Sequence, residues 1–157
     1  MTLGTSKENI NNQPEDSFKV GKTLNQDLAL DTLSDITFDE QTASYNKEFD
    51  TGNGNIDSSG FYTAAADGRY RFRFNMNYRC FNFNNNDNRT LVVSLDIDGT
   101  TLEVEKIKQF QTGTDRFLTL TTDLIYLENG QTVKLKAEFK DAPAGSTLRI
   151  LASNIYP

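Results

Sequence analysis

The chain has 157 residues, no histidine, one cysteine and a formal net charge of −6, with an isoelectric point near 4.6. This length predicts one domain whose core is large enough to fold without disulfides or metals. The acidic charge excludes the overall electrostatic footprint of a nucleic-acid-binding protein. The absence of histidine excludes serine–histidine–aspartate and cysteine–histidine catalytic arrangements, and the single cysteine excludes an intrachain disulfide.

Residues 1–35 form a polar segment that has Phe18 as its only aromatic residue and no sustained hydrophobic period. We interpret the segment as an extended N-terminal arm or anchoring segment, ordered against a neighbour if it is ordered at all. A flexible terminus, an arm that docks into a larger assembly and a short amphipathic helix remain open as alternatives. No signal peptide is visible, and no apolar run approaches the roughly 20 residues that a membrane span needs.

Short strands separated by turns are expected after Ile36. The first strand is expected at residues 36–38, and residues 45–60 are interpreted as a loop that contains a short pairing. The longest alternation has one face made of Tyr70, Phe72, Phe74, Met76, Tyr78 and Cys80. Such strict period-two alternation is typical of a half-buried strand. Gly68 is expected to permit the turn that precedes this strand.

Alternating apolar residues also predict later strands, at residues 91–97, 102–107, 118–120, 124–127, 133–139 and 148–155. The first of these ends at Asp98-Gly99, a dipeptide typical of a hairpin turn. The Asn-rich residues 81–88 are expected to form a polar loop, or alternatively a recognition loop for sugar or protein. No segment has a convincing helical period, so the sequence predicts an all-β sandwich or jelly roll.

Four arginines share the strand face opposite the aromatic residues: Arg69, Arg71, Arg73 and Arg79. Like charges in a row are unfavourable on a sheet unless they are neutralised. Pairing with carboxylates on adjacent strands is one explanation, and a contact between subunits, where arginine bridges carboxylates, is a second. Binding of nucleic acid or an anionic glycan is a third. Arg71 and Arg73 are the candidate subunit-interface residues.

Candidate catalytic and metal-binding groups are few. Cys80 lies on the apolar face of the long strand and is expected to be a buried, unreactive thiol. Two carboxylate pairs lie on strands with roughly 7 Å spacing, which is within the range of glycosidase carboxyl groups: Asp96 with Asp98, and Glu103 with Glu105. A solvated face is the simpler interpretation. Residues 50–57 and 96–99 offer oxygen ligands, but neither matches a twelve-residue calcium loop. We expect no catalytic residue and no cofactor, with calcium as the minor alternative.

A sequence signature spans residues 60–74. It consists of Gly60-Phe61-Tyr62, five further residues, and then Gly68-Arg69-Tyr70-Arg71-Phe72-Arg73-Phe74. This resembles the signature of the globular head domains of the first complement component, which share the jelly-roll fold of tumour necrosis factor. Later stretches are also similar to that family: Asp98-Gly99, residues 127–135 and residues 145–148. The chain departs from the pattern at Asp67, Gln131 and Leu148, where the family has proline, aspartate and phenylalanine, and no collagen-like stalk precedes the domain.

The resemblance covers residues 36–157 and implies a jelly-roll head domain of stalkless, microbial or bacteriophage type that assembles as a homotrimer. The structural signature residues that it implies are Gly60, Tyr62, Gly68, Tyr70, Phe72 and Phe74. Some members of the family bind calcium. Without the stalk, a complement-like role is not implied.

For function we expect a non-enzymatic structural and binding module. Its most concrete form is a bacteriophage virion surface protein, such as a capsid decoration, head fibre or receptor-binding protein. Residues 1–35 would then attach the trimer to a capsid or tail protein. A bacterial adhesin or glycan-binding module is the alternative. We expect neither nucleic-acid binding nor membrane insertion. If the protein is not part of a virion, we expect it to be soluble.

Overall fold

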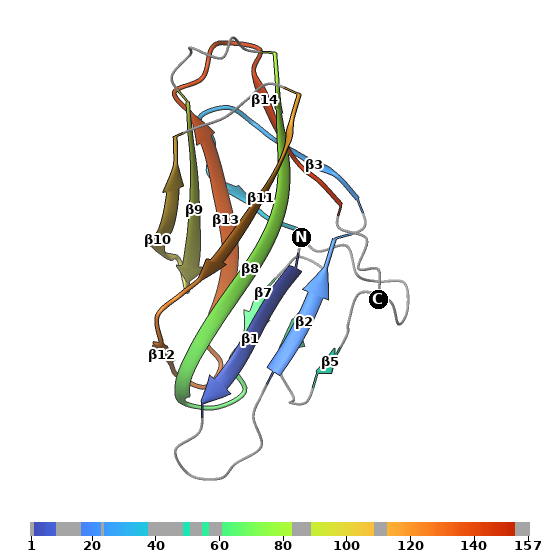
Figure 1. Ribbon diagram of the computed structural model, residues 1–157. Helices are drawn as coiled ribbons and strands as arrows, with labels where there is room; N and C mark the ends of the chain where they lie inside the picture. Colours follow the sequence, from blue (N-terminus) through green and yellow to red (C-terminus); the bar gives the residue numbers. More distant parts are fainter. Residues whose placement is uncertain are drawn as a thin grey trace.

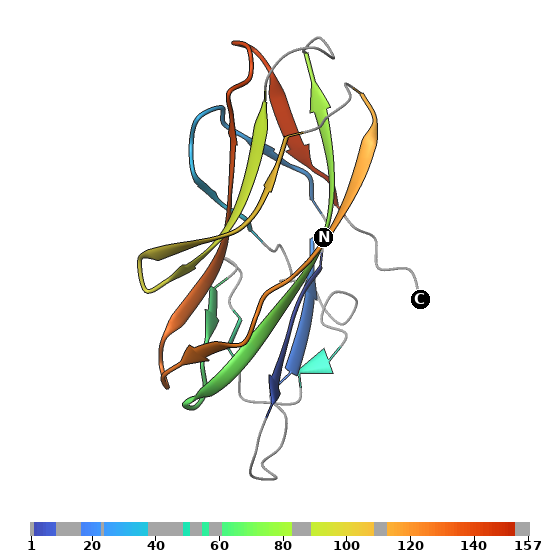
Figure 2. The ribbon, with the colours of Figure 1, turned by 60° about the vertical axis from the view of Figure 1, so that its left-hand side comes forward.

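The computed structural model describes residues 2–8, 17–22, 24–37, 49–50, 55–56, 61–82, 89–108 and 113–152. Throughout these residues the regular elements are β-strands, arranged in two antiparallel sheets that face each other (Figures 1 and 2). The described parts of the chain contain no helix with the length and apolar character of a membrane span.

The first layer, the β8 sheet, is built around the longest strand of the described residues (Figure 1). Its strands are β1 (Thr2–Glu8), β2 (Ser17–Gly21), β3 (Gln26–Leu28), β5 (Phe49–Asp50), β8 (Gly68–Phe81), β11 (Asp115–Thr121), β12 (Ile125–Leu127) and β14 (Thr147–Ile150). β11 and β12 pair with one edge of β8. β14 and β1 pair with the other edge of β8. β11 lies opposite residues 73–79 of β8, and both β14 and β1 pair with some of these same residues, so they must lie on the side away from β11.

The second layer, the β13 sheet, lies behind the first and is seen from another side in Figure 2. Its strands are β4 (Ser34–Asp35), β6 (Asn55–Ile56), β7 (Phe61–Thr63), β9 (Thr90–Ile97), β10 (Thr100–Ile107) and β13 (Thr132–Lys140). The order is β10-β9-β13-β7-β6, and β4 pairs with β13 beyond the end of β7. Asp98 and Gly99 join β9 to β10 with φ angles of 47° and 87°, as a tight hairpin turn requires.

The strand order is that of a jelly roll. One layer contains β3-β14-β8 with β11 on the far edge of β8, and the other contains β7-β13-β9-β10. Eight antiparallel strands divided in this way between two sheets form the jelly-roll architecture. The prediction of an all-β jelly roll is therefore confirmed.

The core lies between the sheets and is made of every second residue of the long strands. From β8 it takes Tyr70, Phe72, Phe74, Met76, Tyr78 and Cys80, and from β9 and β13 it takes Leu91, Val93, Leu95, Val133, Leu135, Ala137 and Phe139. Tyr62 packs edge-on against Tyr70 and Phe72, with ring centroids 5.9 and 6.0 Å apart. Such aromatic pairs each add about 1 kcal/mol beyond the area that they bury.

The aromatic signature residues are therefore core residues. Tyr70 also donates its hydroxyl hydrogen to the carbonyl of Ala66, at 2.7 Å. Gly68 does not have the role expected of it, because it lies in β8 opposite Leu127 and is not among the glycines with positive φ. Its extended backbone continues the strand, and the preceding turn is made by residues 65–67. Gly60 lies outside the described residues.

Residues 1–35 contribute strands to both sheets, which corrects the expectation that they order only against a neighbour. β1 pairs with β8, β3 with β14, and β4 with β13. Main-chain hydrogen bonds hold such short strands, and these bonds leave no hydrophobic period in the sequence. Where a domain boundary lies in this part of the chain stays a prediction.

Candidate functional site

The outer face of the β8 sheet carries the arginine row that the sequence singles out. Arg69 and Arg73 are exposed, and Arg71 is half-buried between them. Across one edge the register places Arg69 opposite Tyr126 of β12 and Arg73 opposite Thr121 of β11. Residues two apart on a strand are roughly 7 Å apart on the same face, so the three guanidinium groups form a ladder along β8.

The end of this face near Phe81 is neutralised within the chain. Arg79 forms an ion pair with Asp115 on the adjacent strand β11. Arg149 on β14 binds Asp27 on β3 through two hydrogen bonds, of 2.6 and 2.9 Å. The hydrogen bond from Arg149 holds the pKa of Asp27 below its ordinary value, and the hydrogen bond from Arg79 does the same for Asp115. The predicted pairing of arginine with carboxylates on adjacent strands is confirmed at Arg79.

Phe81 lies between the two paired arginines. The guanidinium carbons of Arg79 and Arg149 are 5.9 and 5.3 Å from the centre of its ring. Cation–π contacts of this kind favour the charged groups at the ring face. This end of the outer face is therefore ordered by contacts that the chain makes with itself.

The remaining part of the face combines arginines with exposed aromatic side chains. Phe117 on β11 is 66% exposed and lies opposite Asn77, while Tyr126 is 59% exposed and lies opposite Arg69. On the other edge of β8, the register places Glu8 of β1 opposite Arg69 and Gly4 opposite Arg73. We call this surface the arginine–aromatic face and define it by Arg69, Arg71, Arg73, Phe117 and Tyr126.

Sequence reasoning missed the two exposed aromatic residues. The strand was predicted from Leu118 and Leu120. Because these two residues alternate with Phe117 and face the core, Phe117 would have been placed on the outer face. The same argument applies to Tyr126, which lies between Ile125 and Leu127 on β12. The signal was present as alternation, but assigning a face to each residue needed the register with β8.

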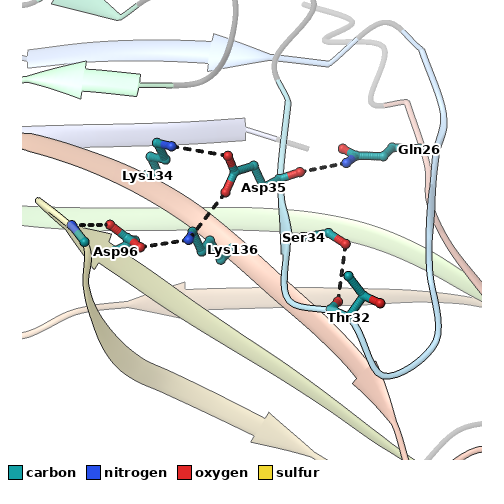
Figure 3. Close-up of polar contacts among 8 residues, drawn as sticks. Gln26, Thr32, Ser34, Asp35, Asp96, Lys134 and Lys136 are labelled. Carbon is teal, nitrogen blue, oxygen red and sulfur yellow. Dashed lines mark hydrogen bonds and ion pairs between the residues drawn. The ribbon is translucent and has the colours of Figure 1, made fainter.

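The outer face of the β13 sheet has a different arrangement, a charged network shown in Figure 3. The ammonium group of Lys136 is 2.8 Å from Asp96 Oδ2 and 3.7 Å from Asp35 Oδ1. Lys134 is 3.3 Å from Asp35 Oδ2, and its Nζ lies 3.7 Å from the centre of the Phe61 ring. Each charge in this network therefore faces an opposite charge or an aromatic ring.

Asp96 is the most enclosed member of the network, with a side chain only 10% exposed beside a Lys136 side chain that is 19% exposed. It also accepts a hydrogen bond of 2.8 Å from the backbone N–H of Gly99. The hydrogen bond from Lys136 lowers the pKa of Asp96, burial opposes that shift, and the Gly99 hydrogen bond supports it. The reciprocal hydrogen bond raises the pKa of Lys136.

Asp98 has a separate structural task. Its Oδ1 accepts hydrogen bonds of 2.8 Å from both the backbone N–H and the hydroxyl of Thr132, which lower its pKa. Asp96 is buried, so the interpretation of a solvated face is wrong for Asp96, whereas Asp98 is exposed. Glu105 accepts a hydrogen bond from the backbone N–H of Lys106, and Glu103 is exposed on the edge strand β10.

The other candidate groups are Cys80 and the oxygen-rich turns. Burial raises the pKa of the Cys80 thiol to about 12, so the prediction of a buried thiol is confirmed. Within the described ranges, no group of three or more Cys, Asp or Glu side chains is placed to hold a metal ion. Most of residues 50–57 and all of residues 83–88 lie outside the described parts.

No protein-family model matches the chain, and no curated protein matches it in sequence. Solved structures do match. The globular domain of the zebrafish complement 1qA protein matches with a TM-score of 0.49 and 15% sequence identity, over 88% of this chain and 96% of that chain. Eiger TNF from S. frugiperda matches with a TM-score of 0.44 and 10% identity, over 99% of this chain and 94% of that chain. The jelly-roll assignment itself rests on the strand order.

Proposed function

We propose that this chain is a non-enzymatic structural and binding module that assembles as a homotrimer through its arginine–aromatic face. The observation that carries the proposal is the coexistence of exposed Phe117 and Tyr126 with the Arg69–Arg73 ladder on one outer face. Aromatic residues and arginine are enriched in the buried parts of protein interfaces. The trimeric state is the one that the sequence resemblance implies.

Charge gives this face a reason to bind another copy. In a threefold assembly each contact joins two different patches of the subunit, so the exposed arginines of one copy can pair with carboxylates on the next. The net charge of −6 leaves the chain rich in such groups. Within the ladder, we place Arg71 and Arg73 in the contact.

The test compares two double charge reversals that alter the net charge equally. Arg71→Glu with Arg73→Glu should convert a trimer into a folded monomer, as measured by light scattering at micromolar concentration. Lys106→Glu with Lys108→Glu, both exposed and on the side of the β13 sheet, should leave the trimer intact. A wild-type chain that is monomeric at that concentration would refute the proposal.

Within this proposal the module belongs to the surface of a bacteriophage particle, as a capsid decoration, head fibre or receptor-binding protein. The polar N-terminal segment supports this assignment, because its strands β1 and β2 extend the β8 sheet beyond β8 and could attach there to a capsid or tail protein. Capsid and tail genes adjacent to the coding sequence would support it further. Mass spectrometry of purified particles should then find the chain in stoichiometric amounts, and its absence from them would contradict the assignment.

The arginine–aromatic face also gives the alternative, a bacterial adhesin or glycan-binding module, a specific basis. Arginine beside an exposed aromatic ring suits an acidic sugar, which offers a carboxylate and an apolar ring face. A glycan array separates the two functions. Selective acidic hits that Arg71→Glu with Arg73→Glu abolishes would favour the glycan module, and an empty array would favour the structural role.

A further inference from the structure

Residues 26–37 cross from the β8 sheet to the β13 sheet. They begin with β3, which pairs with β14, and they end just after β4, which pairs with β13. Between the two strands, Leu30 forms a bridge with Phe139 of β13, and the backbone N–H of Asp31 donates to the carbonyl of Phe139, at 2.8 Å. We call residues 26–37 the crossing loop.

The base of the crossing loop is closed by contacts within the loop. Gln26 Nε2 donates to the carbonyl of Asp35, at 2.8 Å (Figure 3), and Gln26 Oε1 accepts from the backbone N–H of Thr37, at 3.1 Å. Leu28 and Ile36 are buried in the core on either side of this closure. Compact surface loops of about 6 to 16 residues whose ends lie close together are frequently functional.

The tip of the crossing loop is exposed although its base is fixed. Asp31, Thr32 and Leu33 are all exposed, and the exposed fraction of Leu33 is 40%. The tip is also shaped by hydrogen bonds, from the Thr32 hydroxyl to the carbonyl of Leu30 and from the Ser34 hydroxyl to the carbonyl of Thr32 (Figure 3). Groups that are ordered before binding lose less conformational freedom when a partner covers them.

The charge of the crossing loop is negative, because the loop contains three aspartates and no basic residue. Asp27 is paired with an arginine of β14, and Asp35 is paired with two lysines of β13. Asp31 lies at the exposed tip, two residues from Leu33. An apolar and a negatively charged side chain therefore come together at the tip.

Two other exposed leucines have different surroundings. Leu24 is 67% exposed, but the first acid that follows it, Asp27, is already held in an ion pair. Leu102 is 46% exposed, but the adjacent Glu103 lies on the opposite face of β10, because successive residues of a strand alternate between faces. These two leucines serve as controls for Leu33.

We propose that the tip of the crossing loop, formed by Asp31 and Leu33, is the patch of one copy that docks on the arginine–aromatic face of the next copy. Leu33 packs against the exposed aromatic rings of that face, and Asp31 pairs with an arginine of the ladder. The tip lies beside β13, whereas the face is the outer surface of the β8 sheet, so the contact joins two different patches, as a threefold ring requires. This inference rests on the proposed self-association and adds its second patch.

Single substitutions at the tip provide the first test, by sedimentation velocity of the full chain. Leu33→Ser should weaken self-association by about tenfold, and the matched control Leu24→Ser should associate as the wild type does. Asp31→Asn should weaken it by about threefold at low ionic strength and by less at high salt. Asparagine tolerates the φ of 53° that Asp31 adopts, so this variant removes the charge and keeps the loop.

A charge exchange provides the second test. Arg73→Glu alone should weaken association, and adding Asp31→Arg should recover about threefold or more of the loss, because the exchanged charges attract again. Adding Glu103→Arg, which changes the net charge equally, should recover nothing.

The outcomes separate this inference from the proposed function. If Arg71→Glu with Arg73→Glu dissociates the trimer while Leu33→Ser and Asp31→Asn associate as the wild type does, the tip is not the second patch and the proposed function stands. A monomeric wild-type chain overturns both.

Discussion

The two outer faces of the sandwich differ in how their charges are satisfied. On the β13 sheet, Lys136 lies between Asp96 and Asp35, and both carboxylates come from the same chain. On the β8 sheet, Arg69 and Arg73 are exposed, and the aromatic side chains of Phe117 and Tyr126 lie exposed on the same face. One face is complete within the chain, while the other keeps a charged and apolar surface in contact with solvent.

This difference separates a structural role for charge from a recognition role. A network that already pairs its charges loses part of its hydration for no gain when a partner covers it. Exposed arginines beside aromatic rings gain both charge pairing and apolar burial from a suitable partner. We therefore assign stability to the β13 face and association to the arginine–aromatic face.

The largest expected effect tests the β13 face. Asp96→Ala leaves the N–H of Gly99 without its acceptor and Lys136 without its nearest partner, so the free energy of unfolding should fall by about 2 to 3 kcal/mol. Asp96→Asn retains an acceptor oxygen and should lose less. Urea denaturation measures both variants. Wild-type stability in Asp96→Ala would remove the structural role from this network.

A smaller effect is expected on the arginine–aromatic face, and on association instead of folding. Phe117→Ser and Tyr126→Ser should each weaken self-association by about tenfold, because each removes an aromatic contact from the interface. Neither should lower the melting temperature, since both side chains are exposed in the single chain. Sedimentation velocity measures the change, with Leu102→Ser on the β10 edge as the exposed apolar control. Equal losses in all three variants would mean that the contact is not confined to this face.

The pH dependence of stability tests the structural role of Asp96 on the outer face of the β13 sheet. Its folded pKa lies below the ordinary value of 3.8, chiefly because of the hydrogen bond from Lys136. Its contribution to stability is therefore complete above about pH 5 and is lost as the pH falls through the lowered folded pKa. The stability difference between wild type and Asp96→Asn should shrink over that acidic range in thermal melts. A difference that stays constant would show that the charge of Asp96 does not matter.

The smallest effect is expected at the paired end of the β8 sheet. Arg149→Ala removes an ion pair between exposed side chains, and such pairs contribute little because water and salt screen them. The melting temperature should fall by about 2 °C or less. Differential scanning calorimetry at low and high salt measures this. A loss larger than that of Asp96→Ala would reverse the ranking of the two faces.

The core strands could be predicted from the sequence because burial on one face imposes a period of two. The alternation from Tyr70 to Cys80 and from Val133 to Phe139 matches β8 and β13 closely. β1 to β4 could not be found in this way, because main-chain pairing alone leaves little side-chain pattern. Leu28 and Ile36 are buried, but the apolar residues around them do not continue into a long alternating run.

The pairing of charges was beyond the sequence for another reason. Lys134 and Lys136 are 38 or more residues from Asp96 in the chain, and only the β9–β13 register brings these strands side by side. The arginine ladder was predicted from local alternation, whereas the satisfaction of Arg79 by Asp115 depended on which strand lies beside β8. Local patterns predict the face on which a residue lies, and topology decides what it meets there.

The Asp98-Gly99 turn has a consequence for chemical ageing. Aspartyl-glycyl steps isomerise when the glycine nitrogen attacks the aspartate side-chain carbon to form a cyclic imide. Here the N–H of Gly99 donates a hydrogen bond to Asp96, and the carboxylate of Asp98 accepts hydrogen bonds from Thr132. Both reacting groups are held by other partners, so the hydrogen bonds that shape this turn also slow a spontaneous covalent damage to which the bare dipeptide is prone.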